Sequence, residues 1–223
     1  MKRVYVIVEG PTEESFVSGP LAEVFWPLQL YLTPIILGIP GQKGGRTSYA
    51  RVEKDILRQL KQDVRSYCTT MIDFYGLGRG FPGTPLPAQL SNVQKVEHIE
   101  LAVKEDICRQ IPDLRPDVRL IPYLSLHEYE SLLFSDPDSF ARSIGQPHLR
   151  VRFQQILDVF PTPEDINDDP QTAPSKRVIG IYGAYTKVID GTLAARAVGV
   201  HIMRQECAHF RSWLQQLEAL PDL

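Results

Sequence analysis

Three short apolar segments of this chain each run directly into carboxylic acids. The first ends at Glu9, with Glu13 one helical turn later; the second ends at Asp73; the third is followed by Glu128 and Glu130. In a parallel sheet the carboxyl ends of the strands lie at the same edge, so these five acids are expected to converge there. Converging carboxylates repel one another, and a hard divalent cation such as Mg²⁺ or Mn²⁺, which prefers oxygen ligands, would neutralise them.

Two of these acids could also act without any metal. Glu13 would stabilise the positive end of a helix that begins at Pro11, by about 0.3–1 kcal/mol, and Asp73 could close a turn through its own side chain. Glu9 has no such explanation, because it precedes the turn at Gly10 and caps no helix. Glu9 is therefore the acid whose position most strongly indicates chemistry.

The third acidic segment leaves two interpretations open. Ser125 and Glu128 fit a capping box, in which Glu128 would reach back to the backbone at the start of a helix. Glu130 lies beyond that box and is the better ligand candidate of the two acids. His127 could be a metal ligand or a general base, but a surface or packing histidine is the simpler interpretation.

A glycine-rich loop at residues 41–46 carries two cations, Lys43 and Arg46. Free backbone N–H groups in such a loop, together with the two side chains, could bind a phosphate. The loop lacks the spacing of a P-loop, and an ordinary surface loop explains the same residues equally well.

Apolar periodicity predicts the elements that would position these groups. Strands are expected at residues 3–8, 30–39, 67–73 and 117–124, and helices at 11–27, 49–64 and 92–110. Strands that alternate with helices favour an α/β fold with a mostly parallel sheet and flanking helices. Pro34 places its strand at an edge of the sheet or at a bulge, because proline has no N–H for the ladder.

The second part of the chain has a different pattern. Helical periodicity dominates after residue 135, with helices expected at 137–143, 147–158, 192–203 and 207–219 and a loop at 161–175. We therefore expect an α/β core over residues 1–135 and a helical C-terminal part over residues 136–223, packed against that core.

Composition narrows the classes of function. The 223 residues carry a formal net charge of -3, so a nucleic-acid substrate would need local basic patches or metal ions to offset phosphate repulsion. Three scattered cysteines without CxxC spacing argue against a disulfide scaffold or a structural zinc site and favour a cytoplasmic protein. No apolar run approaches the roughly 18 residues that span a membrane, so no membrane association is expected.

Two of the acidic segments resemble motifs of the TOPRIM superfamily, which includes topoisomerases, primases and nucleases of the overcoming-lysogenization-defect type. Residues 8–13, Val-Glu-Gly-Pro-Thr-Glu, look like a strand ending in Glu-Gly, with the second acid that the nuclease version adds one helical turn later. Residues 71–76, Met-Ile-Asp-Phe-Tyr-Gly, stand at the second motif, Asp-x-Asp, but Tyr75 replaces its second aspartate.

A second resemblance covers nearly the whole chain. It is to an uncharacterised bacterial domain-of-unknown-function family in the TOPRIM-like group. Besides the two segments above, it rests on His-Glu-Tyr-Glu-Ser-Leu-Leu-Phe at residues 127–134, Ser-Lys-Arg at 175–177 and Cys-Ala-His-Phe at 207–210.

Together these resemblances imply a metal-dependent nuclease of DNA or RNA that works with an ABC- or SMC-type ATPase encoded nearby, in a system suggestive of phage defence. Mg²⁺ or Mn²⁺ would be held by Glu9, Asp73 and Glu130, with Glu13 and Glu128 as a second set. A lysine of the C-terminal part would stabilise charge at the phosphate, and the candidates are Lys176 and Lys187. For each lysine taken alone, a solvated surface position is the simpler interpretation.

Two other functions stay open at this point. The loss of an aspartate at Tyr75 favours a catalytically degenerate module that binds and regulates a partner protein. A primase-like nucleotidyl transferase has less support, because nothing in the chain indicates a pocket for a nucleotide base. A homo-oligomer is compatible with each of these functions.

Overall fold

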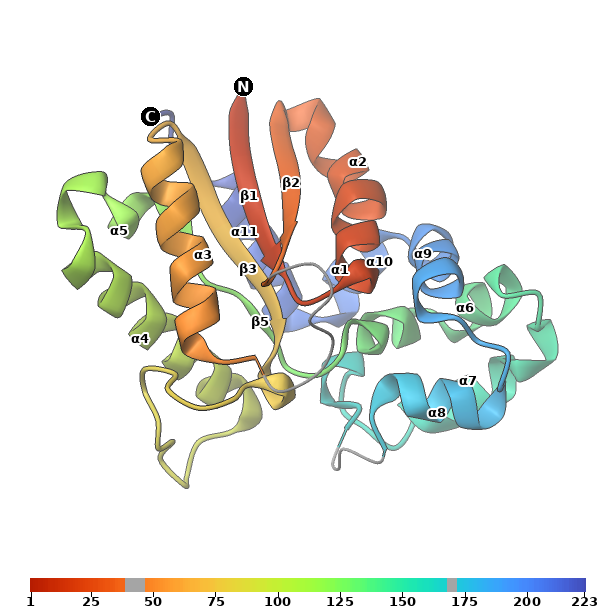
Figure 1. The fold of residues 1–223 in the computed structure, drawn as a ribbon. Coiled ribbons are helices and arrows are strands. Elements are labelled where there is room, and N and C mark those ends of the chain that lie inside the picture. The colour runs from red at the N-terminus through yellow and green to blue at the C-terminus, as the bar shows by residue number, and fades with distance from the viewer. Residues whose placement is uncertain (39–46, 168–171) are drawn as a thin grey trace.

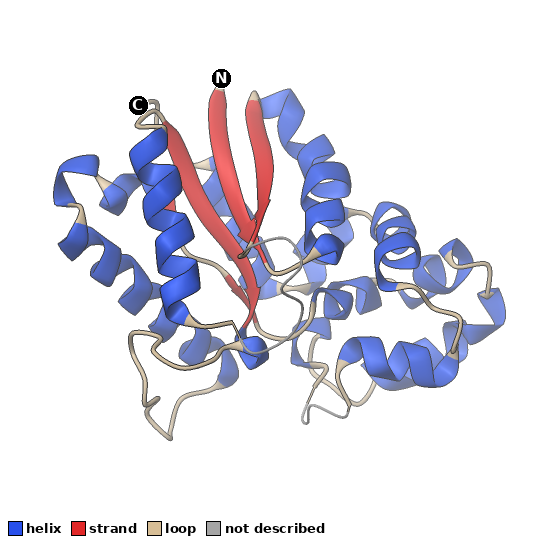
Figure 2. Cartoon of the chain, viewed as in Figure 1, coloured by secondary structure: helices blue, strands red, loops and turns tan. Residues whose placement is uncertain are grey.

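A parallel sheet forms the centre of the protein (Figure 2). The computed structural model describes residues 1–38, 47–167 and 172–223. Within them the sheet has five strands in the order β2-β1-β3-β4, and β5 also pairs with β3. The strands are β1 (Lys2–Val8), β2 (Leu30–Ile36), β3 (Ser66–Asp73), β4 (Leu120–Ile121) and β5 (Leu124–Ser125). Their pairings are all parallel, which confirms the predicted α/β class.

Strand β2 lies at the edge of the sheet, as its proline predicted. The N–H of Leu37 donates to Val8, and the carbonyl of Gln29 accepts from Lys2, so the odd-numbered residues of this segment face β1. Backbone groups alternate in direction along a strand, which turns Pro34 toward the open edge. The missing N–H of Pro34 therefore costs no bond of the ladder and leaves one donor fewer for unwanted pairing.

Helices cover both faces of the sheet, because side chains alternate along each strand. Ile7 of β1 packs with α3 (Tyr49–Gln62) and α4 (Asn92–Gln110) in one buried cluster. Val6 and Val8 point to the other face and pack with α11 (Ala208–Glu218) in a second cluster. Figure 1 shows α3 beside α4 on one side of the sheet and α11 on the other.

The helical segment expected at residues 11–27 is not one regular helix. It consists of α1 (Pro11–Phe16), a π-helical turn (Val17–Leu21), α2 (Ala22–Phe25) and a 3₁₀ turn (Trp26–Leu28). The π-helical turn contains Pro20, which cannot donate the bond that a regular helix requires at that position.

The strand predicted at residues 117–124 is correct only in part. The chain there forms α5 (Pro116–Arg119) and then only the two short strands β4 and β5. Pro116 occupies the first helical turn, where its fixed φ and missing N–H are tolerated, and Asp117 follows at the positive end of the helix. The buried Arg119 holds this segment by donating to the carbonyls of Ser66 and Leu60.

The C-terminal part contains more helices than the sequence indicated. They are α6 (Pro137–Ser143), α7 (Arg150–Leu157), α8 (Pro174–Ile181), α9 (Lys187–Val198), α10 (Val200–Glu206) and α11. Helix α8 was not predicted, and the helix expected at 192–203 is divided at Gly199, whose φ of 81° ends α9.

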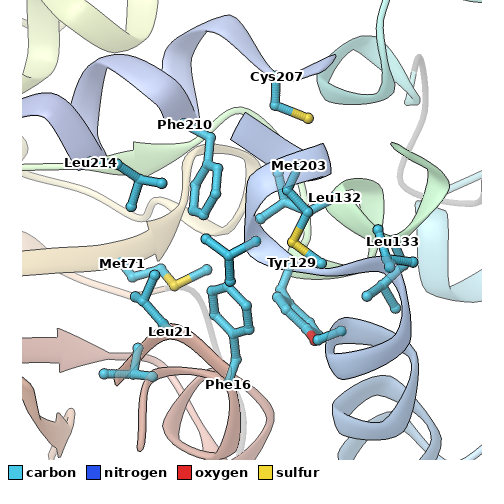
Figure 3. Packing of buried hydrophobic residues seen from close by; sticks show 14 of the residues in the cluster. Phe16, Leu21, Met71, Tyr129, Leu132, Leu133, Met203, Cys207, Phe210 and Leu214 are labelled. Atoms are coloured by element: carbon cyan, nitrogen blue, oxygen red, sulfur yellow. The ribbon is translucent and has the colours of Figure 1, made fainter. Parts of the chain in front are cut away.

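One buried cluster joins the two parts of the chain. Phe16 and Met71 from the first 135 residues pack with Met203, Phe210 and other side chains of the C-terminal helices (Figure 3). Nothing in the structure tests 135 as a boundary between separate domains, and that division stays a prediction. In the described residues, no helix is long and apolar enough to cross a membrane.

Candidate functional site

The ends of three strands bring the predicted acids to one place. Glu9 follows β1, Asp73 ends β3, and β1 and β3 are direct neighbours in the sheet. Asp73 is paired in register with Ser125 of β5, and Glu128 and Glu130 follow that strand within a few residues. The parallel topology therefore gathers acids that are up to 121 positions apart in the sequence. We call Glu9, Glu13, Asp73, Glu128 and Glu130 the strand-end acids.

Gly76 allows two of these acids to lie close together. A Cβ atom added at this glycine would lie 3.2 Å from Oε1 of Glu9 and 3.6 Å from Cβ of Asp73. Any other residue here would need the Glu9 carboxyl group to move. Thr47 donates its hydroxyl to the same Oε1 of Glu9, at 3.2 Å.

Burial and mutual repulsion hold protons on the inner acids. Burial, followed by the charge of Glu13, raises the pKa of Glu9 to about 7. Burial also raises the pKa of Glu130 to about 7. The pKa of Asp73 is well above its usual range because the side chain is buried and faces the other four strand-end acids, Glu9 first among them.

Glu13 has a partner on its own helix. Its Oε2 accepts the backbone N–H of Gly10 at 3.0 Å, so it caps the start of α1, a hydrogen bond beyond the dipole interaction expected from its position in the first turn. Burial nevertheless raises the pKa of Glu13. A capping role and proximity to Glu9 are thus combined in one side chain.

Glu128 and Glu130 meet a cation from the C-terminal part. Nζ of Lys187, the first residue of α9, lies 3.1 Å from Oε1 of Glu128 and 3.6 Å from Oε1 of Glu130. Glu128 also accepts the backbone N–H of Ser175 at 2.9 Å, at the start of α8. Burial favours the protonated form of Glu128, but Lys187 and Ser175 outweigh it and hold its pKa below the usual value.

The capping box predicted at Ser125 and Glu128 is therefore wrong. Ser125 belongs to β5, and the carboxyl group of Glu128 turns to α8 and α9 rather than back to its own backbone. A capping box is recognised in a sequence only by the spacing of three residues between its two side chains. The partners of Glu128 are set instead by the packing of the C-terminal helices, which that spacing does not reveal. Pro174 was a sequence signal for the start of α8, because proline is typical of the first turn of a helix.

The other predicted site residues lie differently. Lys176 is exposed on α8, while the half-buried Lys187 reaches the acids. His127 is 1% exposed and its ring lies 4.8 Å from the ring of Tyr75, which agrees with a packing histidine. Lys43 and Arg46 lie outside the described residues.

Sequence reasoning missed Tyr185 near the strand-end acids. Its hydroxyl group is buried and has no hydrogen-bond partner in the described part of the chain. Burial and then the charge of Glu130 raise the pKa of Tyr185, so this hydroxyl lies close enough to the acids to feel their charge. No pattern in the sequence marks it, because Tyr185 belongs to the turn before α9 and reaches the site only through the packing of the helices.

The strand-end acids have suitable chemistry for Mg²⁺ or Mn²⁺, since all their donor atoms are carboxylate oxygens. Oε1 of Glu130 is buried and accepts no hydrogen bond from the residues that the structure describes, so it is available to a cation. Among the described residues, however, no three His, Cys, Asp or Glu side chains are already grouped closely enough to hold a metal ion. The acids would have to shift before several of them could share one ion.

Comparison with known proteins gives a family. A family model described as a domain of unknown function, DUF4276, matches residues 8–218. The chain belongs to this family. The match includes β2 to β5, the strand-end acids and the C-terminal helices, and it confirms the predicted membership in a domain-of-unknown-function family. The wider TOPRIM relationship stays a prediction.

Other comparisons are more distant. No curated protein gives a sequence match to this chain. Among solved structures, the chain is similar to the C-terminal region of the Xanthomonas campestris pv. campestris OLD protein, with 15% sequence identity and a TM-score of 0.46. That similarity covers 98% of this chain and 95% of the other.

Proposed function

We propose that the protein is a divalent-metal-dependent nuclease that hydrolyses phosphodiester bonds of DNA or RNA at the strand-end acids. The observation that carries the proposal is the position of Glu9, Asp73 and Glu130, three acids with raised pKa values at or just after the ends of neighbouring strands. Glu130 is buried, and Glu9 and Asp73 are half-buried. Buried acids that face one another are costly in free energy, and a fold retains them most readily where a cation binds.

In this proposal Glu9, Asp73 and Glu130 would hold Mg²⁺ or Mn²⁺. The ion, when bound, supplies Lewis acidity and lowers the pKa of a water molecule. Gly76 keeps space for the Glu9 carboxyl group, and Thr47 orients that group through its hydroxyl. Lys187 balances charge at Glu128 and Glu130. An ABC- or SMC-type ATPase as partner, nucleic acid as substrate and a role in phage defence are further parts of this proposal and rest on the TOPRIM-like motifs.

Cleavage assays test the proposal directly. The purified protein is incubated with Mg²⁺ or Mn²⁺ and with single- and double-stranded DNA and RNA, alone and with the ATPase encoded nearby. We expect metal-dependent cleavage that Glu9→Gln and Asp73→Asn abolish, while Glu14→Gln on the same helix as Glu13 retains it. Absence of cleavage under all these conditions, or unchanged cleavage by Glu9→Gln, would reject the nuclease.

A second candidate is a degenerate module that binds and regulates a partner protein. Two observations favour it: Tyr75 stands where the TOPRIM pattern has an aspartate, and Lys187 already neutralises part of the charge at the strand-end acids. Calorimetric titration with Mn²⁺ separates the two candidates. Binding that is lost in Asp73→Asn supports the enzyme, whereas absence of binding to the wild type supports the degenerate module.

A further inference from the structure

Lys187 occupies a position that helix stability does not explain. It is the first residue of α9, where the positive end of the helix dipole disfavours a cation. Its side chain is 40% exposed, and its ammonium group turns to Glu128 and Glu130 rather than to solvent. The attraction of these two acids therefore has to offset the unfavourable interaction of Lys187 with the helix dipole.

The surroundings of Lys187 are those of a cation site. Oε1 of Glu130 is almost fully buried, accepts no hydrogen bond within the described part of the chain and lies 3.6 Å from the ammonium group. The buried hydroxyl of Tyr185 also lacks a hydrogen-bond partner in the described residues. Two buried polar atoms close to the acids that Lys187 pairs with thus have unused capacity to bind a better-placed positive charge.

We propose that Lys187 is a built-in counter-ion of the strand-end acids, which a divalent cation must displace before it binds. This inference rests on the proposed metal dependence of the protein and deepens it. It explains why no metal-ready group of acids is found among the described residues, since Lys187 holds Glu128 and Glu130 in an ion-paired arrangement. The affinity for the metal ion would then depend on its competition with Lys187 for the acids, as well as on the ligands themselves.

Displacement would also reach the C-terminal helices. Glu128 joins α8 through the backbone of Ser175 and α9 through Lys187. When a divalent cation replaces the ammonium group, the contact between Glu128 and α9 is lost, while the contact with α8 does not depend on Lys187. The start of α9 is therefore the segment that metal binding loosens.

Thermal unfolding at a series of Mg²⁺ concentrations tests the proposal. It compares the wild type with Lys187→Met, which removes the charge, Lys187→Arg, which keeps it, and Lys176→Met, a charge removal on exposed α8. The pH is kept at about 8.5, so that protons do not replace Lys187 on the acids. The quantity measured is the Mg²⁺ concentration that gives half of the maximal stabilisation.

We expect Lys187→Met to lower this concentration by about tenfold or more, because one repelling charge within a few Å of the cation is gone. It should also lower the melting temperature of the metal-free protein. Lys187→Arg and Lys176→Met should stay within about twofold of the wild type. If Lys187→Met does not fold without metal, Lys187→Gln is measured in its place.

A second measurement follows the ammonium group itself. Acetylation of lysines, located by mass spectrometry, should become faster at Lys187 when Mg²⁺ is added and stay unchanged at Lys176. Stabilisation of the wild type by Mg²⁺ with an equal or higher half-point in Lys187→Met would overturn the counter-ion and leave the metal-dependent function standing. If Mg²⁺ stabilises none of the variants, both the counter-ion and the metal-dependent function are rejected.

Discussion

The protein buries acids in two places and treats them differently. In the first, which we call the His209 cluster, Glu100 and Glu164 surround His209. Nε2 of His209 lies 3.0 Å from Glu100, and both oxygens of Glu164 accept backbone N–H groups, those of His209 and Phe210, at 3.0 and 2.8 Å. At the strand-end acids, in contrast, buried Asp73 has four other acids as its main charged neighbours.

The difference separates structural acids from acids available for chemistry. Glu164 satisfies the N–H groups at the start of α11, where the helix dipole also favours a negative charge. Its burial therefore fixes a helix in place. The acids around Asp73 repel one another, and in the proposed function a divalent cation would offset this repulsion. Burial alone does not distinguish the two groups, whereas their partners do.

The largest expected effect on stability is at Glu164, an acid of the His209 cluster. Glu164→Ala leaves two backbone N–H groups at the start of α11 without their acceptor, so it should lower the free energy of unfolding by about 3 kcal/mol. Urea denaturation measures this change. Asp165→Ala, at the next residue, serves as control and should cost less than about 1 kcal/mol. A loss at Glu164 no larger than the control would mean that its contacts contribute little.

The strand-end acids should make the metal-free protein less stable as the pH rises. The pKa of Glu9 is raised from 4.5 to about 7, so between these values the folded protein binds more protons than the unfolded chain. Stability is then lost with rising pH across this window, by an amount on the order of 2–3 kcal/mol. The measurement is the free energy of unfolding against pH in the presence of a chelator.

Glu9→Gln is the matched variant for this pH dependence. It should flatten the decrease without abolishing it, because Glu130, whose pKa is also about 7, contributes with the same sign. His209 adds a smaller loss at higher pH, since its pKa is raised by Glu100, and Glu9→Gln should leave that contribution in place. Identical curves for the wild type and Glu9→Gln would contradict the raised pKa.

Asp73→Asn should have the opposite sign to Glu164→Ala. At a pH high enough to ionise Asp73, the amide removes the repulsion and the desolvation that its charged form costs, so the metal-free protein should gain about 1 kcal/mol of stability. The same variant should lose any stabilisation by Mg²⁺. Chemical denaturation with and without Mg²⁺ measures both quantities, and destabilisation of the metal-free protein would place Asp73 with the structural acids.

This comparison also shows how far the sequence leads. The short apolar segments of β1 and β3 and the helical periodicity of α3 and α4 predicted the sheet and hence the convergence of Glu9 and Asp73. These patterns are local in the sequence. The parallel topology of the sheet then places the ends of the predicted strands, and the acids on them, close together. The prediction of one continuous strand after α4 failed. Two-residue strands have no period to detect, and Pro116 begins a helix where that strand was expected.

What the sequence could not provide is the set of long-range partners. Glu128 looked like a helix cap until Lys187, 59 positions later, was found beside it. Glu164 stood in a segment expected to be a loop, and nothing local links it to the start of α11, 45 positions away. Such contacts depend on how whole helices pack, so a buried acid can be recognised from sequence more readily than its role.

The smallest expected effect concerns Tyr75, the residue that departs from the TOPRIM pattern. Its ring is 41% exposed and packs against His127. Tyr75→Asp restores the second acid of the pattern, and we expect it to strengthen Mg²⁺ binding about fivefold, which corresponds to ~1 kcal/mol. Calorimetry measures the affinity, and Tyr75→Phe, which keeps the ring contact and adds no charge, should match the wild type.

The result decides how the strand-end acids are completed. A gain in Tyr75→Asp would mean that position 75 faces the cation and that the natural site functions with one acid fewer. No gain, with affinity still lost in Asp73→Asn, would mean that Glu130 from the segment after β5 has taken the place of the missing aspartate. Because Glu130 is buried beside Lys187, the second outcome would place the cation close to the C-terminal helices, whereas the first would leave it next to Gly76.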